Sequence, residues 1–394
     1  MVLHSREVLG LKIYKAYKFR MYPDEEQVSM LNSFLGTKRF IYNNYLYKKE
    51  KYRQEKIIFN LLDMKKDLIN LQQEYPWLKE MDGCILRTTL EDLDNNYNYF
   101  NKKQRGNPKY KKKNYRESYR TVCLRSSYNG KEYASIKLDL ERKVIKLPKL
   151  DEIKIRGYRH LKSFPHKILN ATVSKEAGRY YVSVCVEAEI PEIKFISRNI
   201  IGIDLGIKDL IICSDGTKYP KIRRIKVQEQ RIAGMQKALA RCQEGSKNSQ
   251  KLIKKIERAY QKIRNIRKYY IHKITTRLVK ENDIIIAETL KVKEMIEKGK
   301  NHLAKSLSNA SFQEITRQLL YKAQWYNKKF YQVNTYYASS QICSHCGVKN
   351  ERIKELSIRE WECICGNMND RDLNASINIM DKGFEMFLKE QYEI

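Results

Sequence analysis

The 394-residue sequence has no long apolar run and few acidic side chains. No stretch approaches the roughly 20 apolar residues of a membrane-spanning helix, and residues 1–11 lack the apolar segment of a signal peptide. Asp and Glu number 46 against 78 Lys and Arg, which gives a net charge of +32. We therefore expect a cytoplasmic protein that does not bind membranes and that binds a polyanion with strong salt dependence.

The cysteines are typical of an intracellular protein with one metal site rather than of a disulfide-linked one. Five of the nine are scattered and are expected to be reduced packing residues: Cys84, Cys123, Cys185, Cys213 and Cys242. The other four lie in the motifs CSHCG (343–347) and CICG (363–366). Their grouping predicts one structural zinc held by Cys343, Cys346, Cys363 and Cys365. The second motif is one residue shorter than usual, and His345 is an alternative ligand.

Two buried strands are predicted around Asp204. The sequence IGIDLGIKDLIIC (residues 201–213) has two apolar runs joined by a glycine-containing turn, which predicts a hairpin inside a sheet. A carboxylate in the first of these strands is costly to bury unless a cation or hydrogen-bond donors meet it. The alternative is a strand-end aspartate in a turn, without a catalytic role.

Two further acidic residues favour the catalytic interpretation. Glu288 follows the apolar run 284–287, and Asp372 begins a predicted helix that continues through Ile379. An aspartate on a strand, a glutamate on a strand and an aspartate on a helix, in this order, are typical of an RNase H-like nuclease core. Such carboxylates can hold two Mg²⁺ ions. Asp370 is the alternative to Asp372, but its place at the helix start favours a capping role.

The segments before residue 190 predict helices followed by strands. Helices are expected from Pro23 to about residue 103, with a capping box at Asp24 and Gln27 and a break after Gly36. Strands are expected at residues 12–20 and across residues 119–187, enough for a small β-barrel. Residues 228–280 predict a charged helical hairpin, and Ser311 and Glu314 predict a second capping box.

A basic loop separates these helices from the strands. The residues Lys109, Tyr110, Lys111, Lys112 and Lys113 combine positive charge with an aromatic ring. Tyr is also common elsewhere, at 28 residues, and is interleaved with Lys and Arg. Such mixtures suit phosphate contact with base stacking, so we predict that this loop binds nucleic acid. The alternative is a solvated linker.

The combined motifs resemble the TnpB family, transposon-encoded RNA-guided nucleases related to the smallest type V CRISPR effectors. The resemblance covers residues 13–379. Its motifs are YKFRMYP (17–22 and Pro23), RFIYN (39–43), GIDLG (202–206), AETL (287–290), KAQW (322–325), SSQIC (339–343) and DRDLNA (370–375). The shortened second cysteine motif and Ser376, where alanine is common, are the departures.

The resemblance implies a multi-domain protein of α/β and β class. A wedge β-barrel would comprise residues 1–21 and 105–196, and it would carry a helical recognition lobe at 22–104. A RuvC-like, RNase H-like core would comprise residues 197–336, with the helical hairpin 228–280, and residues 368–394. A zinc ribbon at residues 337–367 would be inserted in this core.

The implied activity is guide-RNA-directed, magnesium-dependent cleavage of double-stranded DNA beside a short motif. Asp204 would bridge the two metal ions, with Glu288 and Asp372 completing their ligands. Three alternatives stay open from the sequence: an RNA-guided DNA-binding repressor that does not cut, a protein-only transposase or resolvase, and a small CRISPR effector.

Overall fold

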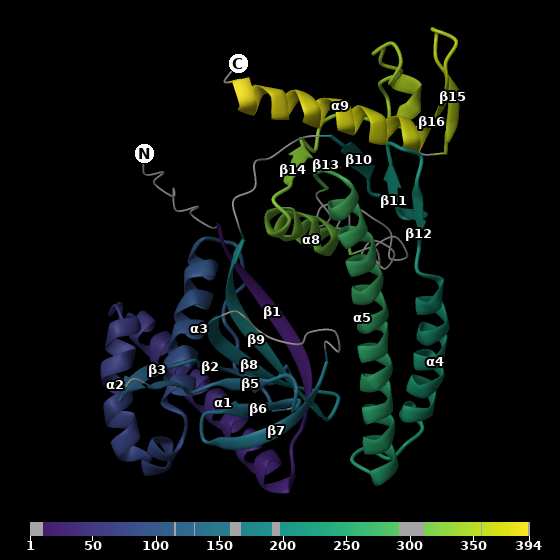
Figure 1. The fold of residues 1–394 in the computed structure, drawn as a ribbon. Helices are drawn as coiled ribbons and strands as arrows, with labels where there is room; N and C mark the ends of the chain where they lie inside the picture. Colours follow the sequence, from purple (N-terminus) through teal and green to yellow (C-terminus); the bar gives the residue numbers. More distant parts are fainter. Residues whose placement is uncertain are drawn as a thin grey trace, which may run out of the picture. The chain divides into compact units, whose positions relative to one another are not determined.

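The computed structural model describes residues 11–113, 116–129, 131–157, 167–190, 198–290, 311–355 and 357–392. Residues 1–10, where no signal peptide is expected, lie outside this set. The chain forms two compact units, Lys12–Glu189 and Ile190–Ile394 (Figure 1). This division falls near the predicted boundary at residues 196–197, and the finer divisions stay predictions.

The first unit contains a seven-stranded sheet in the order β2-β8-β9-β1-β7-β6-β5. The strands are β1 (Leu11–Tyr22), β2 (Ser118–Val122), β5 (Lys137–Asp139), β6 (Val144–Leu147), β7 (Leu150–Arg156), β8 (Lys167–Glu176) and β9 (Arg179–Ile190). A separate hairpin joins β3 (Arg125–Tyr128) to β4 (Lys131–Ala134). Within the described residues β2 and β5 are the ends of the sheet, so the predicted barrel closure is not confirmed.

The helices of the first unit are α1 (Glu25–Gln54), α2 (Leu61–Glu74), the short η1 (Pro76–Glu80) and α3 (Gly83–Asn101). The capping box at Asp24 and Gln27 is confirmed. The predicted break after Gly36 is wrong, because α1 runs through this residue without interruption. A glycine inside a helix costs only about 1 kcal/mol, and the apolar residues Leu31, Phe34 and Ile41 bury this helix on both sides of Gly36.

The second unit is built on a five-stranded sheet in the order β12-β11-β10-β13-β14. Its strands are β10 (Ile200–Asp204), β11 (Asp209–Cys213), β12 (Lys218–Pro220), β13 (Ile284–Glu288) and β14 (Lys329–Val333). The predicted hairpin is confirmed, since β10 pairs antiparallel with β11. On its other side β10 pairs parallel with β13, which pairs parallel with β14. The C-terminal ends of β10 and β13, at Asp204 and Glu288, therefore lie side by side at one edge of the sheet.

Helices cover both faces of this sheet. They are α5 (Lys247–Glu281) and α8 (Phe312–Trp325) on one face and α9 (Arg371–Tyr392) on the other, while α4 (Arg223–Ala240) packs against α5. Ile203, Ile285 and Ala287 pack against α5 and α8, whereas Ile284 and Ile286 pack against α9. The alternation follows from the two-residue period of a strand. Figure 1 shows α9 crossing β13 and β10, and α4 lying alongside α5 as the predicted hairpin.

The predicted capping box at Ser311 is wrong. The backbone of Ser311 has a φ of 56°, in the left-handed region, and its side chain makes no capping hydrogen bond to α8. Glu314, its expected partner, instead accepts hydrogen bonds from Arg317 and Gln318. No helix among the described residues is long and apolar enough to cross a membrane.

Candidate active site and cysteine site

Asp204 lies on the face of β10 that carries α9. A Cβ added at Gly202 would lie 2.2 Å from the Ser376 carbonyl oxygen and 2.7 Å from the Met380 Cβ. The helix therefore sits directly on Gly202, closer than any larger residue allows. Asp204, two residues further on, points to the same side of the sheet. The absence of a side chain at Gly202 is thus what lets α9 approach the acidic end of β10.

Glu288 occupies the corresponding position on the neighbouring strand. Gly202 and Ile286 are partners in the parallel register, so Asp204 and Glu288 follow them side by side. The two carboxyls share a side-chain hydrogen bond. The backbone N–H of Leu205 also donates to Glu288 Oε1, at 3.0 Å. Because β10 and β13 are parallel, two acidic residues far apart in the sequence end as direct neighbours.

Asp372 lies in the first turn of α9, one helical turn before Ser376. Its charge is close enough to raise the pKa of Asp204. Its two carboxylate oxygens, however, accept hydrogen bonds from Arg359 Nη1 at 3.1 and 3.3 Å. In the part of the chain that is described, the three carboxyls do not form one compact metal-binding group. Asp204 and Glu288 are in contact, and Asp372 stands nearby with Arg359.

Asp370 has the geometry of a helix cap, as predicted. Its Oδ1 accepts from the backbone N–H groups of Asp372 and Leu373, at 3.0 and 3.1 Å. Its Oδ2 accepts from Lys218 Nζ at 2.7 Å. Burial raises the pKa of Asp370, but Lys218 and the two N–H donors bring it below its ordinary value. Of Asp370 and Asp372, it is therefore the charge of Asp372 that raises the pKa of Asp204.

The surroundings of the two carboxyls shift their pKa values in the same direction. Burial, followed by the charges of Glu288 and Asp372, raises the pKa of Asp204 well above its usual range. Burial also raises the pKa of Glu288, against the hydrogen bonds from Leu205 and Asp204 that lower it. Carboxylate oxygens are the ligands that Mg²⁺ prefers. A divalent cation between Asp204 and Glu288 would favour their charged forms, so these residues fit the ion that the resemblance implies.

The cysteine site has the dimensions of a zinc site. The Sγ atoms of Cys343, Cys346, Cys363 and Cys365 all lie within 4.8 Å of one another. Two of these separations are 3.9 Å (Cys343 to Cys365) and 3.5 Å (Cys346 to Cys363). Four sulfurs at about 2.3 Å from one zinc ion stand about 3.8 Å apart in a tetrahedron. The shortened second motif therefore does not prevent tetrahedral grouping.

Both cysteine motifs turn in the same way. The N–H of Gly347 donates to the Cys343 carbonyl oxygen, and the N–H of Gly366 donates to that of Cys363, both at 2.8 Å. These glycines have φ values of 76° and 82°, where other residues are strained. Burial raises the pKa of Cys343, but backbone N–H donors lower it to about 6, which favours a thiolate ligand. His345 is exposed and is not part of the group.

The basic loop is held on α1 rather than being an unattached linker. The side-chain amide of Asn43 accepts from the Lys111 N–H at 2.7 Å and donates to the Lys111 carbonyl oxygen at 3.1 Å. Lys111 Nζ lies 4.6 Å from the centre of the Tyr42 ring. Tyr110 Oη is 3.4 Å from Glu50 Oε2. The predicted residues Lys109, Tyr110, Lys111, Lys112 and Lys113 are all exposed.

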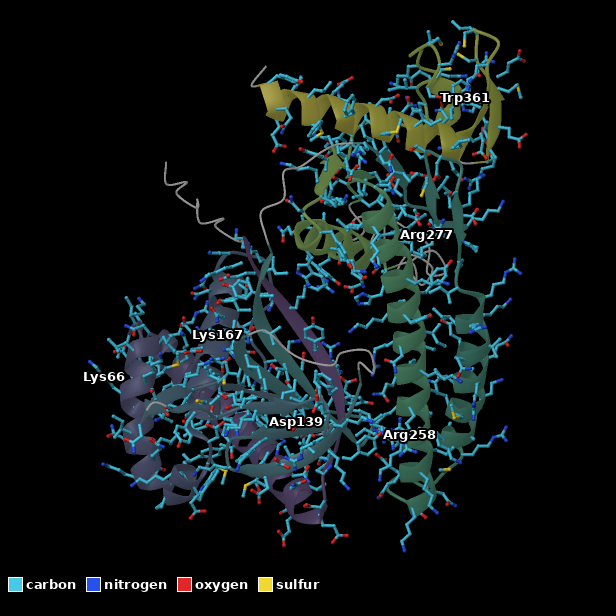
Figure 2. All side chains as sticks on the ribbon, in the orientation of Figure 1. Lys66, Asp139, Lys167, Arg258, Arg277 and Trp361 are labelled. Atoms are coloured by element: carbon cyan, nitrogen blue, oxygen red, sulfur yellow. The ribbon has the colours of Figure 1, made fainter. Side chains whose placement is uncertain are left out.

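A second group of cations lies on α5. At about 100° per residue, six exposed residues share an arc of about 60° that extends for about 44 Å. They are Lys251, Lys255, Arg258, Lys262, Lys273 and Lys280. None has an ion-pair partner within the described ranges. Figure 2 labels Arg258, a member of this α5 stripe.

Three lysines of α1 differ from the cations of the α5 stripe, because they are paired with acidic residues. Lys48 and Lys49 pair with Asp67 and Asp94, at 2.6 and 2.9 Å. Lys38 pairs with Asp92 at 2.7 Å. These charges join α1 to α2 and α3 and are compensated inside the unit. Among the described residues the α5 stripe has no acidic partners, and such unpaired positive charge is the arrangement that binds a polyanion.

The sequence did not indicate several residues around these sites. They are Lys218 and Arg359 beside the acidic residues, and Asn369, whose Nδ2 lies 3.7 Å from Cys343 Sγ. Arg371, Asn374 and Asn378 also bond to the segments around the cysteines. The spacing of these last three, which repeats every three to four residues, was the available signal, because it marks one face of a helix.

Three family descriptions match parts of the chain. Residues 183–299 match OrfB_IS605, described as "Probable transposase". Residues 312–379 match "Cas12f1-like, TNB domain". Residues 13–57 match a "Helix-turn-helix domain", although the structure has strand β1 and the single long helix α1 in this range.

Relatives match nearly the whole chain. "Putative RNA-guided DNA endonuclease InsQ" of Escherichia coli (strain K12) is 30% identical over 390 residues, which cover 95% of this chain and 93% of that protein. "Putative RNA-guided DNA endonuclease" of Streptomyces pristinaespiralis is 29% identical and covers 94% of this chain and 90% of its own length. The solved Cas12f1-sgRNA-target DNA complex contains a similar fold, with a TM-score of 0.57 at 13% identity over 94% of this chain and 99% of that one. The chain therefore belongs to the TnpB family, which is related to the type V CRISPR effectors.

Proposed function

We propose that this protein is a guide-RNA-directed, magnesium-dependent endonuclease, associated with a transposable element, that cuts double-stranded DNA beside a short motif. The observation that carries the proposal is the carboxyl pair of Asp204 and Glu288, with Asp372 within electrostatic range. The names of the relatives support the RNA-guided activity. The α5 stripe and the loop 109–113 offer surfaces for the phosphate backbones of the guide RNA and the target DNA.

The proposed core is RuvC-like, with Asp204, Glu288 and Asp372 as the residues that would hold two magnesium ions. Bound magnesium would supply a Lewis acid for the phosphodiester and an activated water. Other parts of the chain position these three carboxylates. The N–H of Leu205 orients Glu288, and α9 carries Asp372 toward the sheet at Gly202. The four cysteines would hold a structural zinc, with no position left for water.

The test is cleavage of a plasmid target, in magnesium, by the protein co-expressed with its flanking genomic DNA. Asp204→Ala is expected to lower the cleavage rate by about 10³-fold or more, because metal stabilisation of the transition state is worth several kcal/mol. Guided DNA binding should be retained. Asp215→Asn is the matched control. Asp215 is exposed in the turn after β11, and the side-chain oxygen of the asparagine can still accept from the Thr217 N–H.

Each outcome separates the alternatives. Guide-dependent cleavage that Asp204→Ala abolishes and Asp215→Asn leaves intact supports the proposal. Guided binding without cleavage by the parent protein would identify an RNA-guided repressor. Cleavage that does not depend on the guide would identify a protein-only enzyme, and equal cleavage by Asp204→Ala would contradict the assignment of the site.

A further inference from the structure

Two buried asparagines of α9 bind the segment that carries the first cysteine motif. Asn378 Nδ2 donates to the carbonyl oxygens of Ser339 and Ile342, at 2.8 and 2.6 Å. Asn374 Nδ2 donates to the Ile342 oxygen at 2.7 Å, and its Oδ1 accepts from the Ser344 N–H at 2.8 Å. Asn374 is only 2% exposed and Asn378 only 5%. Both amides therefore depend on the folded cysteine motif for their hydrogen bonds.

Arg371 binds the segment that leads to the second cysteine motif. Its Nη1 donates to the carbonyl oxygens of Glu355 and Ile358, at 2.6 and 3.3 Å, and its backbone N–H donates to the Arg359 oxygen at 2.8 Å. Arg359 in turn bonds Asp372. The strands β15 (Glu360–Glu362) and β16 (Met368–Asp370) pair antiparallel, and β16 leads directly into α9.

Two faces of α9 therefore contact different parts of the second unit. Arg371, Asn374 and Asn378 are spaced by three and four residues and lie on one face, which binds the cysteine ribbon (residues 337–367). Asp372, Ser376 and Ile379 lie on the next face, which meets the sheet at Gly202 and Ile286. Asp372 is therefore held between the ribbon and the sheet, within the two turns of helix that the ribbon binds.

We propose that Arg371, Asn374 and Asn378 are positioning residues that make the placement of Asp372 depend on the folded, zinc-loaded ribbon. This inference rests on the proposed function for the role of Asp372. If the ribbon loses its fold, the buried side chains of all three residues lose their acceptors, and the first turns of α9 lose their anchor. Reactions of this kind are sensitive to displacements of about 1 Å, which can cost about 10²-fold in rate.

The test uses the full chain with its guide RNA and the double variant Asn374→Ala/Asn378→Ala. Alanine has the highest helix propensity, so the substitutions do not weaken α9 by themselves. Asn378→Asp is a second variant of the same size and shape, which removes the N–H donors and places a carboxyl group against the same two carbonyl oxygens. Lys389→Ala, at an exposed position of the same helix, is the control. Zinc release is started with a mercurial thiol reagent and followed with a zinc-selective dye.

The variants should release zinc about tenfold faster than the parent and cleave at least about tenfold more slowly, with unchanged binding of guide and target. A readout that does not require cleavage is the effect of Mg²⁺ on the ribbon. If the two sites are coupled, Mg²⁺ binding stabilises the zinc-loaded ribbon by the same free energy by which the ribbon stabilises the magnesium site. Saturating Mg²⁺ should slow zinc release from the parent but not from the double variant. The fluorescence of Trp361, in the core of the ribbon (Figure 2), reports its folding once Trp77 and Trp325 are replaced by phenylalanine.

Faster zinc release without slower cleavage would overturn the inference, and so would slower cleavage with unchanged zinc release. If the parent never cleaves but Mg²⁺ still slows its zinc release, the coupling stands and the nuclease proposal fails. If the parent cleaves and Mg²⁺ has no effect on zinc release, the nuclease proposal stands and the coupling fails.

Discussion

At the scale of single residues, Gly202 matters because it has no side chain. The Ser376 carbonyl oxygen and the Met380 side chain occupy the space where its Cβ would be. Gly383 has the same role on the other side of the contact, since its Cβ would lie 2.2 Å from the Ile286 Cγ2. Two glycines, one on the strand and one on the helix, therefore set the distance between α9 and the sheet.

We predict that Gly202→Ala lowers the free energy of unfolding by about 1–3 kcal/mol, the usual cost of overpacking. Cleavage should also fall, because α9 must move and Asp372 moves with it. Gly234→Ala is the control: Gly234 lies inside α4 with no atom near the new methyl group, and alanine should stabilise the helix by about 1 kcal/mol. Thermal unfolding measures both changes in stability, the expected loss in Gly202→Ala and the expected gain in Gly234→Ala. Equal stability of Gly202→Ala and the parent would contradict the packing argument.

At the scale of elements, the contact of α5 with α8 contains a buried lysine. Lys322 is 3% exposed. Its Nζ donates to the His272 carbonyl oxygen at 3.0 Å and to the hydroxyls of Thr275 and Thr276 at 2.6 and 2.8 Å. No carboxylate lies within 4.0 Å of it in the described residues. Burial lowers the pKa of Lys322 to about 8.

A lowered lysine pKa predicts a pH dependence of stability with a definite sign. Between about pH 8 and the ordinary value of 10.5, the unfolded chain binds the Lys322 proton and the folded protein does not. Stability therefore rises with pH in this range. Relative to Lys322→Met, the parent should gain up to about 3 kcal/mol from pH 8 to 10.5, at 1.36 kcal/mol per pKa unit. Denaturant unfolding at several pH values measures the difference, and Lys389→Met, an exposed control, should show none.

At the scale of the whole molecule, the cations behind the net charge of +32 fall into two groups, those paired with acidic residues and those without such partners in the described part of the chain. Part of it is compensated within the first unit by ion pairs such as Lys48 with Asp67. The α5 stripe carries cations without such partners in the described part of the chain. Unpaired cations such as those of the α5 stripe release counterions when they contact a nucleic acid, whereas cations already paired with a carboxylate do not.

This distinction predicts a change in salt dependence. Replacing Lys251, Lys255, Arg258 and Lys262 by glutamine should make the negative slope of log K against log salt concentration shallower by up to about 3, at about 0.7–0.9 for each phosphate contact. The matched control is Lys48→Gln/Lys49→Gln, which removes paired cations and should leave the slope unchanged. Titration of a guide RNA at several salt concentrations gives both slopes. Equal slopes for the parent and the α5 variant would remove the stripe from the binding surface.

Much of the architecture follows from local patterns. The strands found within residues 119–187, the helical hairpin α4–α5 and the capping box at Asp24 agree with the sequence, because apolar periodicity and cap chemistry act over a few residues. The break at Gly36 and the cap at Ser311 were wrong. In each case a one-residue preference was weaker than the packing of the whole helix or than the backbone conformation at its start.

The sequence by itself determined which side chains are available: three acidic residues in a fixed order, four cysteines in two motifs and a large excess of positive charge. The tertiary structure alone decided their neighbours. The parallel pairing of β10 with β13 puts Asp204 beside Glu288, and the ribbon contacts of α9 put Arg359 beside Asp372. Such contacts join residues that are far apart along the chain, so their partners depend on strand register and helix packing, which no short stretch of sequence specifies.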